Sequence, residues 1–341
     1  MTGSAVNPWR GKHGPLLICE IGGNHEGDFG CARRLTELAI EAGVDFVKFQ
    51  LYRGATLVSS LEAPDRLAHF TRFELLPEQH LALARLCESA GVGYMASVWD
   101  LDMLDFIDAH LPIYKVGSGD LTALPMLRAF ALRGKPIILS TGLSTLDEVL
   151  EAVRFIQSTN PVYRRREMLA LLQCTSMYPI DNAEANLRVM DTLRSATGLA
   201  VGYSDHTTGR LALFAAAARG AEVLEFHLTD DRAGKSFRDH QVSLTRDEVR
   251  DLCAQLDELQ ALLGDGVKRP LACEIETGHV RSFRRAVYCR RPLKAGEVIQ
   301  QADLVVLRPN HGIDAREFDA VAGKHAARDL RAFEALEVQS E

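Results

Sequence analysis

The chain has 341 residues, of which 47% are hydrophobic and 25% are charged, and its formal net charge is −7. This length suits one large domain followed by a small one, and the composition is that of an ordinary soluble globular protein. The acidic balance argues against a nucleic-acid-binding protein. No apolar run reaches the roughly 18 residues that a membrane-spanning helix needs, so no membrane partner is expected.

The first fourteen residues are polar and lack the apolar segment of a signal peptide. The seven cysteines are odd in number, are scattered along the chain and include no CxxC pair. These features favour a reduced, cytoplasmic location over a disulfide framework.

Eight short apolar runs alternate along the chain with longer segments of helical pattern. The runs occupy residues 16–22, 46–52, 93–98, 113–118, 136–141, 168–174, 199–205 and 223–229. Nearly continuous apolar strands separated by helices indicate a parallel sheet that is covered on both faces. Eight such units within about 250 residues predict a (β/α)8 barrel. The alternative is a doubly wound open sheet, which more often carries a glycine-rich phosphate turn after its first strand.

The pattern changes after residue 263. We predict a barrel over 1–264, a polar linker over 265–281 and a small β-rich domain over 282–341, with short strands around a KAGE turn. A domain of about 60 residues is only marginally stable alone, so we expect it to pack on its own barrel or on a partner subunit.

Polar residues gather where each predicted strand ends, which in parallel barrels is the end that holds the active site. Lys48 and Gln50 lie two residues apart and therefore share one face of their strand, as do Glu225 and His227. Lysines that point inward, such as Lys48 and Lys115, suit a phosphate or carboxylate ligand, although a lysine in a strand more often lies at an edge.

Two histidines from adjacent strands, His206 and His227, suit a divalent metal ion. The alternative for each histidine is a hydrogen-bonded core residue. The histidines expected on the surface are His13, His69, His80, His110, His279 and His325.

At these residues the sequence resembles the sialic acid synthases, a family that includes N-acetylneuraminate, legionaminic and pseudaminic acid synthases. The resemblance covers nearly the whole chain. Its motifs are ICEIGGNHEGD (18–28), VKFQ (47–50), KVGSGDLTALPML (115–127), GKPIILSTGLSTLDEV (134–149), QCTSMYPIDNAEANL (173–187), VGYSDHTTG (201–209) and GAEVLEFHLTDD (220–231). The segments 284–313 and 323–330 resemble the family's antifreeze-protein-like domain, of β-clip fold.

The resemblance implies an enzyme of carbohydrate biosynthesis, a transferase that joins phosphoenolpyruvate to an open-chain sugar aldehyde and releases phosphate. It implies Mn²⁺ or Mg²⁺ as the cofactor, with His206 and His227 as the metal ligands. It also implies catalytic roles for Glu20, Glu225 and Arg308. The residues implied to hold phosphoenolpyruvate are Lys48, Gln50, Ser97, Lys115, Ser118, Ser140 and Ser176, and those implied to contact the sugar are Asn24, Tyr178 and Arg308.

In the family, the arginine that Arg308 matches reaches into the barrel of the other subunit, which implies a domain-swapped homodimer. Three segments depart from the family pattern, namely ASVWD (96–100), KFQL (48–51) and RPNHG (308–312). They lie around the sugar rather than the phosphate, so the acceptor stays open. One alternative is a synthase of another ulosonic acid from a different or phosphorylated aldose, and another is a barrel that binds a sugar acid without catalysis.

Overall fold

The computed structural model describes residues 7–339, and residues 1–6 and 340–341, at the ends of the two predicted domains, lie outside the described part. The chain divides into two compact units, Met1–Gly264 and Asp265–Glu341. Each unit is described by itself.

The first unit is a closed barrel of eight parallel strands, in which neighbours follow the chain order and the first strand, β2, also pairs with the last, β9. All eight predicted strands and the barrel fold are confirmed. The strands are β2 Gly14–Glu20, β3 Phe46–Leu51, β4 Gly93–Val98, β5 Tyr114–Val116, β6 Ile137–Ser140, β7 Leu169–Cys174, β8 Ala200–Ser204 and β9 Val223–His227.

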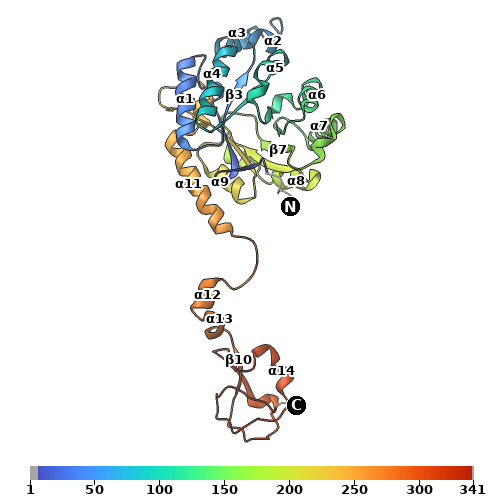
Figure 1. Ribbon diagram of the computed structural model, residues 1–341, viewed down its shortest axis with the longest axis vertical. Coiled ribbons are helices and arrows are strands. Elements are labelled where there is room, and N and C mark those ends of the chain that lie inside the picture. The colour runs from blue at the N-terminus through green and yellow to red at the C-terminus, as the bar shows by residue number, and fades with distance from the viewer. Residues whose placement is uncertain (1–6, 340–341) are drawn as a thin grey trace. The chain divides into compact units, whose positions relative to one another are not determined.

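Helices surround these strands (Figure 1). They begin where the sequence offers caps: Thr145 and Glu148 form a capping box at the start of α7, and Thr245 and Glu248 form one at α11. The helices are α1 Phe29–Ala42, α2 Gly54–Leu57, α3 Pro64–Phe73, α4 Pro77–Ser89, α5 Leu104–Ile107, α6 Leu124–Arg133, α7 Leu146–Thr159, α8 Val189–Thr197, α9 Leu211–Ala218, α10 Asp239–Val242 and α11 Arg246–Leu263.

The apolar core has two layers, one between the strands and the helices and a smaller one inside the barrel. The inner layer contains Trp9, Ile18, Met95 and Leu172. Trp9 precedes a short strand, β1 Arg10–Gly11, that pairs antiparallel with the start of β2, so its buried indole closes the amino-terminal end of the barrel. Buried polar side chains of the strands, such as Glu20, Ser140 and His227, lie at the opposite, carboxyl-terminal end.

His80 is fully buried on α4, and its Nδ1 lies 2.8 Å from the hydroxyl of Tyr94. The expectation that it lies on the surface was therefore wrong. The reason is that His80 falls on the apolar face of α4 together with Leu83 and Cys87. The hydroxyl of Tyr94 meets its Nδ1, while its buried Nε2 has no hydrogen-bond partner among the described residues.

The second unit is small and built around an antiparallel pair, β10 Ala286–Cys289 and β11 Leu304–Leu307. Its described residues, 265–339, include the short helices α12 Ala272–Glu276, α13 His279–Ser282 and α14 Phe318–Val321. The predicted linker, 265–281, contains α12 and most of α13. A separate apolar core holds Val287, Leu293, Ile299 and Leu336. Within residues 7–339, no helix combines the length and apolar character needed to cross a bilayer.

Candidate active site

A cavity of about 600 Å³ opens at the carboxyl-terminal ends of the barrel strands. Every one of the eight strands contributes at least one polar or sulfur-containing side chain to its wall. These are Glu20 from β2, Lys48 and Gln50 from β3, Ser97 from β4, Lys115 from β5, Ser140 from β6, Cys174 from β7, Ser204 from β8, and Glu225 and His227 from β9. Since a sealed barrel would fill this layer with apolar side chains, the polar lining indicates a ligand site.

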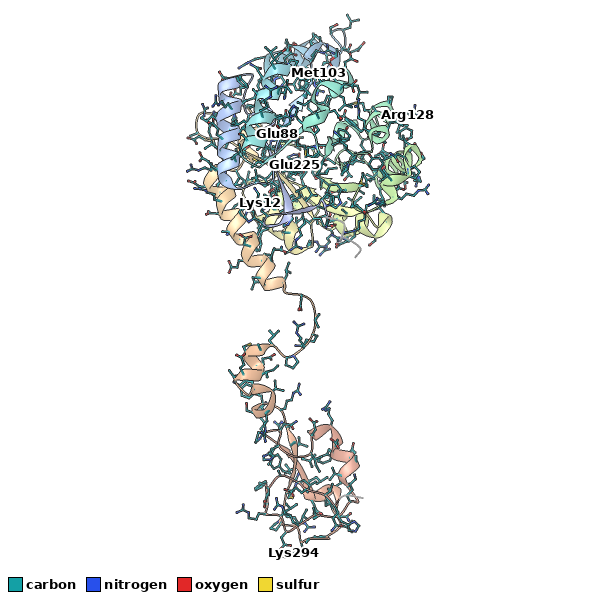
Figure 2. The ribbon with its side chains drawn as sticks, in the orientation of Figure 1. Lys12, Glu88, Met103, Arg128, Glu225 and Lys294 are labelled. Carbon is teal, nitrogen blue, oxygen red and sulfur yellow. The ribbon has the colours of Figure 1, made fainter. Side chains whose placement is uncertain are left out.

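The centre of the cavity is a buried cluster of four charges. Lys48 forms ion pairs with both Glu20 and Glu225, with its Nζ 3.3 Å from Glu225 Oε1. Lys115 Nζ lies 3.2 Å from Glu225 Oε2 and donates a hydrogen bond of 2.7 Å to Ser140 Oγ. All four charged side chains are at most 5% exposed (Glu225 is labelled in Figure 2). Two ammonium groups thus balance two carboxylates.

These contacts set the protonation states of the cluster. Burial alone would raise the pKa of Glu225, but the ammonium groups of Lys115 and Lys48 outweigh it and hold that pKa below its usual range. Burial lowers the pKa of Lys48 to about 8, assisted by Lys115 and opposed by Glu225. Glu225 is therefore a fixed anion at neutral pH, while the proton on Lys48 is comparatively labile.

The two predicted metal ligands lie side by side, with the ring centroids of His206 and His227 5.5 Å apart. His206 Nδ1 lies 2.7 Å from the carbonyl oxygen of Thr175, which can only accept, so Nδ1 carries the proton and the lone pair is on Nε2. Burial lowers the pKa of both rings, which keeps them neutral. Neutral imidazole is the form that binds a metal.

Other atoms near the histidines are also suited to a divalent cation. His227 Nδ1, Asp239 Oδ1 and Glu20 Oε1 are buried and have no hydrogen-bond partner among the residues described. His227 Nδ1 lies 4.0 Å from Asp239 Oδ2. Within residues 7–339, no three acidic, histidine or cysteine side chains are already gathered as a ligand set. The donors therefore fit a metal that takes two imidazoles from the protein and its other ligands from oxygen groups.

Two predicted serines are brought together by a glycine. Gly142, which follows β6, donates its backbone N–H to Ser118 Oγ at 3.0 Å. A Cβ at Gly142 would collide with Ser176 Oγ and lie 2.8 Å from Ser118 Oγ. Only glycine leaves room for both hydroxyls beside Ser140, where together they form a rim of donors suited to an anion.

Tyr178 lies above the histidine pair, with its ring centroid 4.0 Å from that of His206 and 5.7 Å from that of His227. The guanidinium of Arg238 lies over the ring of Tyr178, 4.7 Å from its centroid. Arg238 also lies 3.4 Å from Asp239. Tyr178 thus separates the metal donors from the outer part of the cavity.

Asn24 is not among the residues that line this cavity, and its role as a sugar contact stays a prediction. Its side-chain amide donates hydrogen bonds to the carbonyl oxygen of Leu228, at 2.7 Å, and to Ser243 Oγ, at 2.8 Å. Ser243 Oγ in turn donates to the carbonyl oxygen of Asp239. Asn24 therefore connects the loop after β2 to the segment that carries Asp239.

Sequence reasoning missed several residues of the site, among them Trp99, Asp120, Phe237, Arg238 and Asp239, which all line the cavity. Trp99 directly follows β4, so the rule that strand ends carry function could have found it. The other four lie in the connections that follow β5 and β9, where no periodicity shows which side chain points inward. Arg308 lies in the second unit, where its guanidinium is 5.7 Å from the Phe283 ring centroid.

The sequence profile of the NeuB family matches residues 35–268, and that of the SAF domain matches residues 284–336. The chain is 34% identical to N,N'-diacetyllegionaminic acid synthase of Campylobacter jejuni, over 93% of this chain and 97% of that protein. It is 33% identical to human N-acetylneuraminate-9-phosphate synthase, over 78% and 76% of the two chains. The crystal structure of the N-acetylneuraminic acid synthetase of Leptospira borgpetersenii, in complex with citrate, superposes with a TM-score of 0.71 at 29% identity, covering 77% of this chain and 90% of that one.

Proposed function

The chain belongs to the NeuB family, and from that premise we propose that it condenses phosphoenolpyruvate with an open-chain aldose of the N-acetylmannosamine type. The products are a 2-keto sugar acid of the sialic acid type and inorganic phosphate. The relatives named above are synthases of such acids, which supports the reaction class. The acceptor class and the metal dependence are part of the proposal.

The observation that carries the proposal is the pairing of an anion site with a metal site in one cavity. Lys48, Lys115 and Ser140 lie on the floor of the barrel, and His206 and His227 lie beside them. An anionic nucleophile and a polarised carbonyl can be held next to each other only where both kinds of group converge.

Phosphoenolpyruvate is placed at the lysine side. Lys48, Lys115, Ser118 and Ser140 would donate to its phosphate and carboxylate oxygens, with Gln50, Ser97 and Ser176 completing the lining. The four buried charges already cancel, so the anion needs further positive charge at the mouth of the cavity. Arg308 would provide it from the second subunit of a domain-swapped homodimer, as the family resemblance implies.

Mn²⁺ or Mg²⁺ held by His206 and His227 would supply a Lewis acid for the aldehyde oxygen of the acceptor. The enol carbon of phosphoenolpyruvate attacks the aldehyde carbon, and the aldehyde oxygen takes up a proton to become a hydroxyl group. Positive charge develops at the former enol carbon, which the neighbouring carboxylates Glu20 and Glu225 stabilise.

Water then adds to that carbon and gives up a proton, after which the bond to the phosphate oxygen breaks and leaves the 2-keto group. Glu20 is the preferred general base, because its Oε1 has no hydrogen-bond partner among the described residues. Glu225 is the second choice, since both of its oxygens already face lysine ammonium groups.

The test is phosphate release from phosphoenolpyruvate with Mn²⁺ and a panel of free and phosphorylated aldoses. Release that depends on one acceptor and stops when the metal is chelated would support the proposal. Turnover of a phosphorylated or shorter aldose alone would support a synthase of another ulosonic acid. Binding of the product acid without any turnover would support a non-catalytic barrel, and the proposal would then be wrong.

A further inference from the structure

One side of α3 carries basic side chains at a regular spacing. Arg66, His69 and Arg72 follow one another at intervals of three residues, so they lie along the same side of the helix. All three are exposed, and Arg66 and His69 line the cavity. This row of side chains therefore borders the mouth of the cavity, outside the buried floor that holds Lys48 and Lys115.

A second segment brings another arginine to this row. The ring of Phe237 stacks on His69, with centroids 5.9 Å apart, and packs on Phe73 at 5.0 Å. His69 in turn packs on Phe73 at 4.4 Å. Because Arg238 directly follows Phe237, the three rings place Arg238, an exposed residue that lines the cavity, beside the basic side of α3.

The three guanidinium groups act on one imidazole. Burial of the ring and the positive charges of Arg238, Arg72 and Arg66 all lower the pKa of His69. The ring is therefore neutral at pH 7, and the positive charge of the cluster resides on the guanidinium groups. We call Arg66, His69, Arg72 and Arg238 the basic rim.

The arginines of the basic rim lack strong carboxylate partners. Within residues 7–339, Arg66 and Arg72 form no ion pair, and each guanidinium lies instead over a phenylalanine ring of α3. Arg238 has one ion pair, a contact of 3.4 Å with Asp239, which also belongs to the candidate metal donors. An anion that binds between like charges relieves their repulsion, and the planar guanidinium group pairs well with phosphate oxygens.

Two other residues show what is specific to the rim. Arg53, in the same stretch of chain, pairs with Asp100 at 2.6 Å and with Asp102 at 3.3 Å, and it does not line the cavity. The carboxyl group of Asp120 does line the cavity, but its charged neighbour is Lys115, which opposes the rise of its pKa to about 6 that burial causes. Asp120 therefore does not neutralise the rim.

We propose that the basic rim is a second anion site, separate from the lysines of the floor, and that it takes a phosphate group. The charges of the floor cancel among themselves, so guanidinium groups without a firm carboxylate partner are found at the rim instead. A phosphate ion released at the buried floor meets the exposed rim on its way to solvent. This use of the site rests on the proposed function, whereas phosphate binding itself does not.

The test follows the imidazole of His69 by NMR in the full-length protein with Mg²⁺, and His69→Gln identifies its resonance. Inorganic phosphate should raise the pKa of His69 relative to chloride at equal ionic strength, because a bound dianion stabilises the imidazolium. The same titration with phosphoenolpyruvate separates the two sources of the group. A shift with inorganic phosphate alone assigns the rim to the released product, and a shift with both assigns it to entry and exit alike.

Two variants and a matched control locate the effect. Arg66→Gln and Arg238→Gln should each weaken phosphate binding about fivefold, through the loss of one solvated charge contact. Arg53→Gln, which removes an arginine already paired with Asp100, should bind phosphate as the unaltered protein does. A native NMR spectrum shows that each variant has folded.

No shift with inorganic phosphate, or a shift that persists in both rim variants, overturns the inference. If KM for N-acetylmannosamine 6-phosphate rises in the rim variants and inorganic phosphate causes no shift, the arginines serve the acceptor and the inference is again wrong. If phosphate binds at the rim and no acceptor is turned over, the second anion site stands and the proposed function alone is contradicted.

Discussion

Asn24, in the loop after β2, donates a hydrogen bond of 2.7 Å to the carbonyl oxygen of Leu228, just beyond the end of β9. Since β2 and β9 are the strands that close the barrel, this bond joins the loops that follow the first and the last strand. The second bond, to Ser243, extends the connection to the segment that carries Asp239. The position of Asp239 near the predicted metal ligands therefore depends on the side chain of Asn24.

Asn24→Ala should destabilise the barrel by about 1–3 kcal/mol, because it leaves buried acceptor groups without donors. Denaturant unfolding of the first unit measures this. The variant should also raise KM for the acceptor while leaving KM for phosphoenolpyruvate unchanged, because the lysine side of the cavity does not touch this segment. Ser243→Ala, which removes one of the two bonds, should show a smaller loss, and an equal change in both KM values would contradict the positioning role.

Glu20→Gln should lower kcat by about a hundredfold to ten-thousandfold if Glu20 is the base that activates water. The substitution keeps the size of the side chain and removes one anion beside Lys48, so KM for phosphoenolpyruvate should not rise. Steady-state phosphate release provides both parameters. Near-normal turnover would eliminate Glu20 and transfer the role to Glu225, whose own glutamine variant would then be the inactive one.

Mn²⁺ at about a hundred times its dissociation constant should stabilise the protein by about 2.7 kcal/mol, because the metal binds the folded state alone. For a barrel of this size, that corresponds to an increase of roughly 5–10 °C in Tm. Differential scanning fluorimetry without substrate detects the shift. His227→Ala should abolish it and His325→Ala, an exposed histidine of the second unit, should not. A full shift in His227→Ala would exclude that histidine as a ligand.

Acid should destabilise the barrel from pH 6.5 downward. Burial lowers the pKa of His25 to about 4 and that of His80 to about 3, so between these values and 6.5 the unfolded chain binds protons that the folded chain does not. Stability then falls as pH falls, by about 1.4 kcal/mol per pH unit for each such histidine. Denaturant unfolding between pH 7 and 5 measures the slope. His80→Gln should reduce this slope by the contribution of one histidine, about 1.4 kcal/mol per pH unit, relative to His325→Gln. Equal slopes in the two variants would contradict the lowered pKa of His80.

A domain-swapped dimer predicts complementation between inactive variants. Arg308→Ala and Glu20→Gln should each be inactive alone, while their co-expression should restore about one quarter of the activity, since half of the dimers are mixed and one of their two sites is intact. Gel filtration should show a dimer throughout. A fully active monomer, or no recovery of activity on co-expression, would contradict the exchange of the second unit between subunits.

The barrel was predictable because its strands are apolar on both faces. Its candidate functional side chains were predictable because active sites of parallel barrels lie at the carboxyl-terminal ends of the strands. Lys48, Lys115 and His227 occupy strand ends, and the alternation of side chains indicates their direction. His80 was not predictable, because its burial depends on which turn of α4 faces the sheet and on a hydroxyl fourteen residues away.

The loops are where sequence reasoning failed. Asn24 lies in a strongly recognisable motif, yet the motif does not show that its amide donates to two acceptors more than 200 residues along the chain. Asp239, at the start of the short helix α10, and Asp120 reach the cavity through the course of the connections after β9 and β5, which no local pattern encodes. The contacts among Tyr52, Phe70 and Trp99 likewise depend on where α3 packs, so the sequence showed three aromatic residues without showing that they meet.

The buried indole of Trp9, at the amino-terminal end of the barrel, is one of two intrinsic fluorophores of this type in the chain. The chain contains two tryptophans, Trp9 in the buried core of the amino-terminal end and Trp99 in the wall of the cavity at the other end. Their intrinsic fluorescence therefore comes from two separate reporters, one sensitive to unfolding of the barrel and one to its occupancy. In Trp99→Phe, the remaining emission should follow folding alone, and the difference from the unaltered protein isolates the signal of a sugar entering the site.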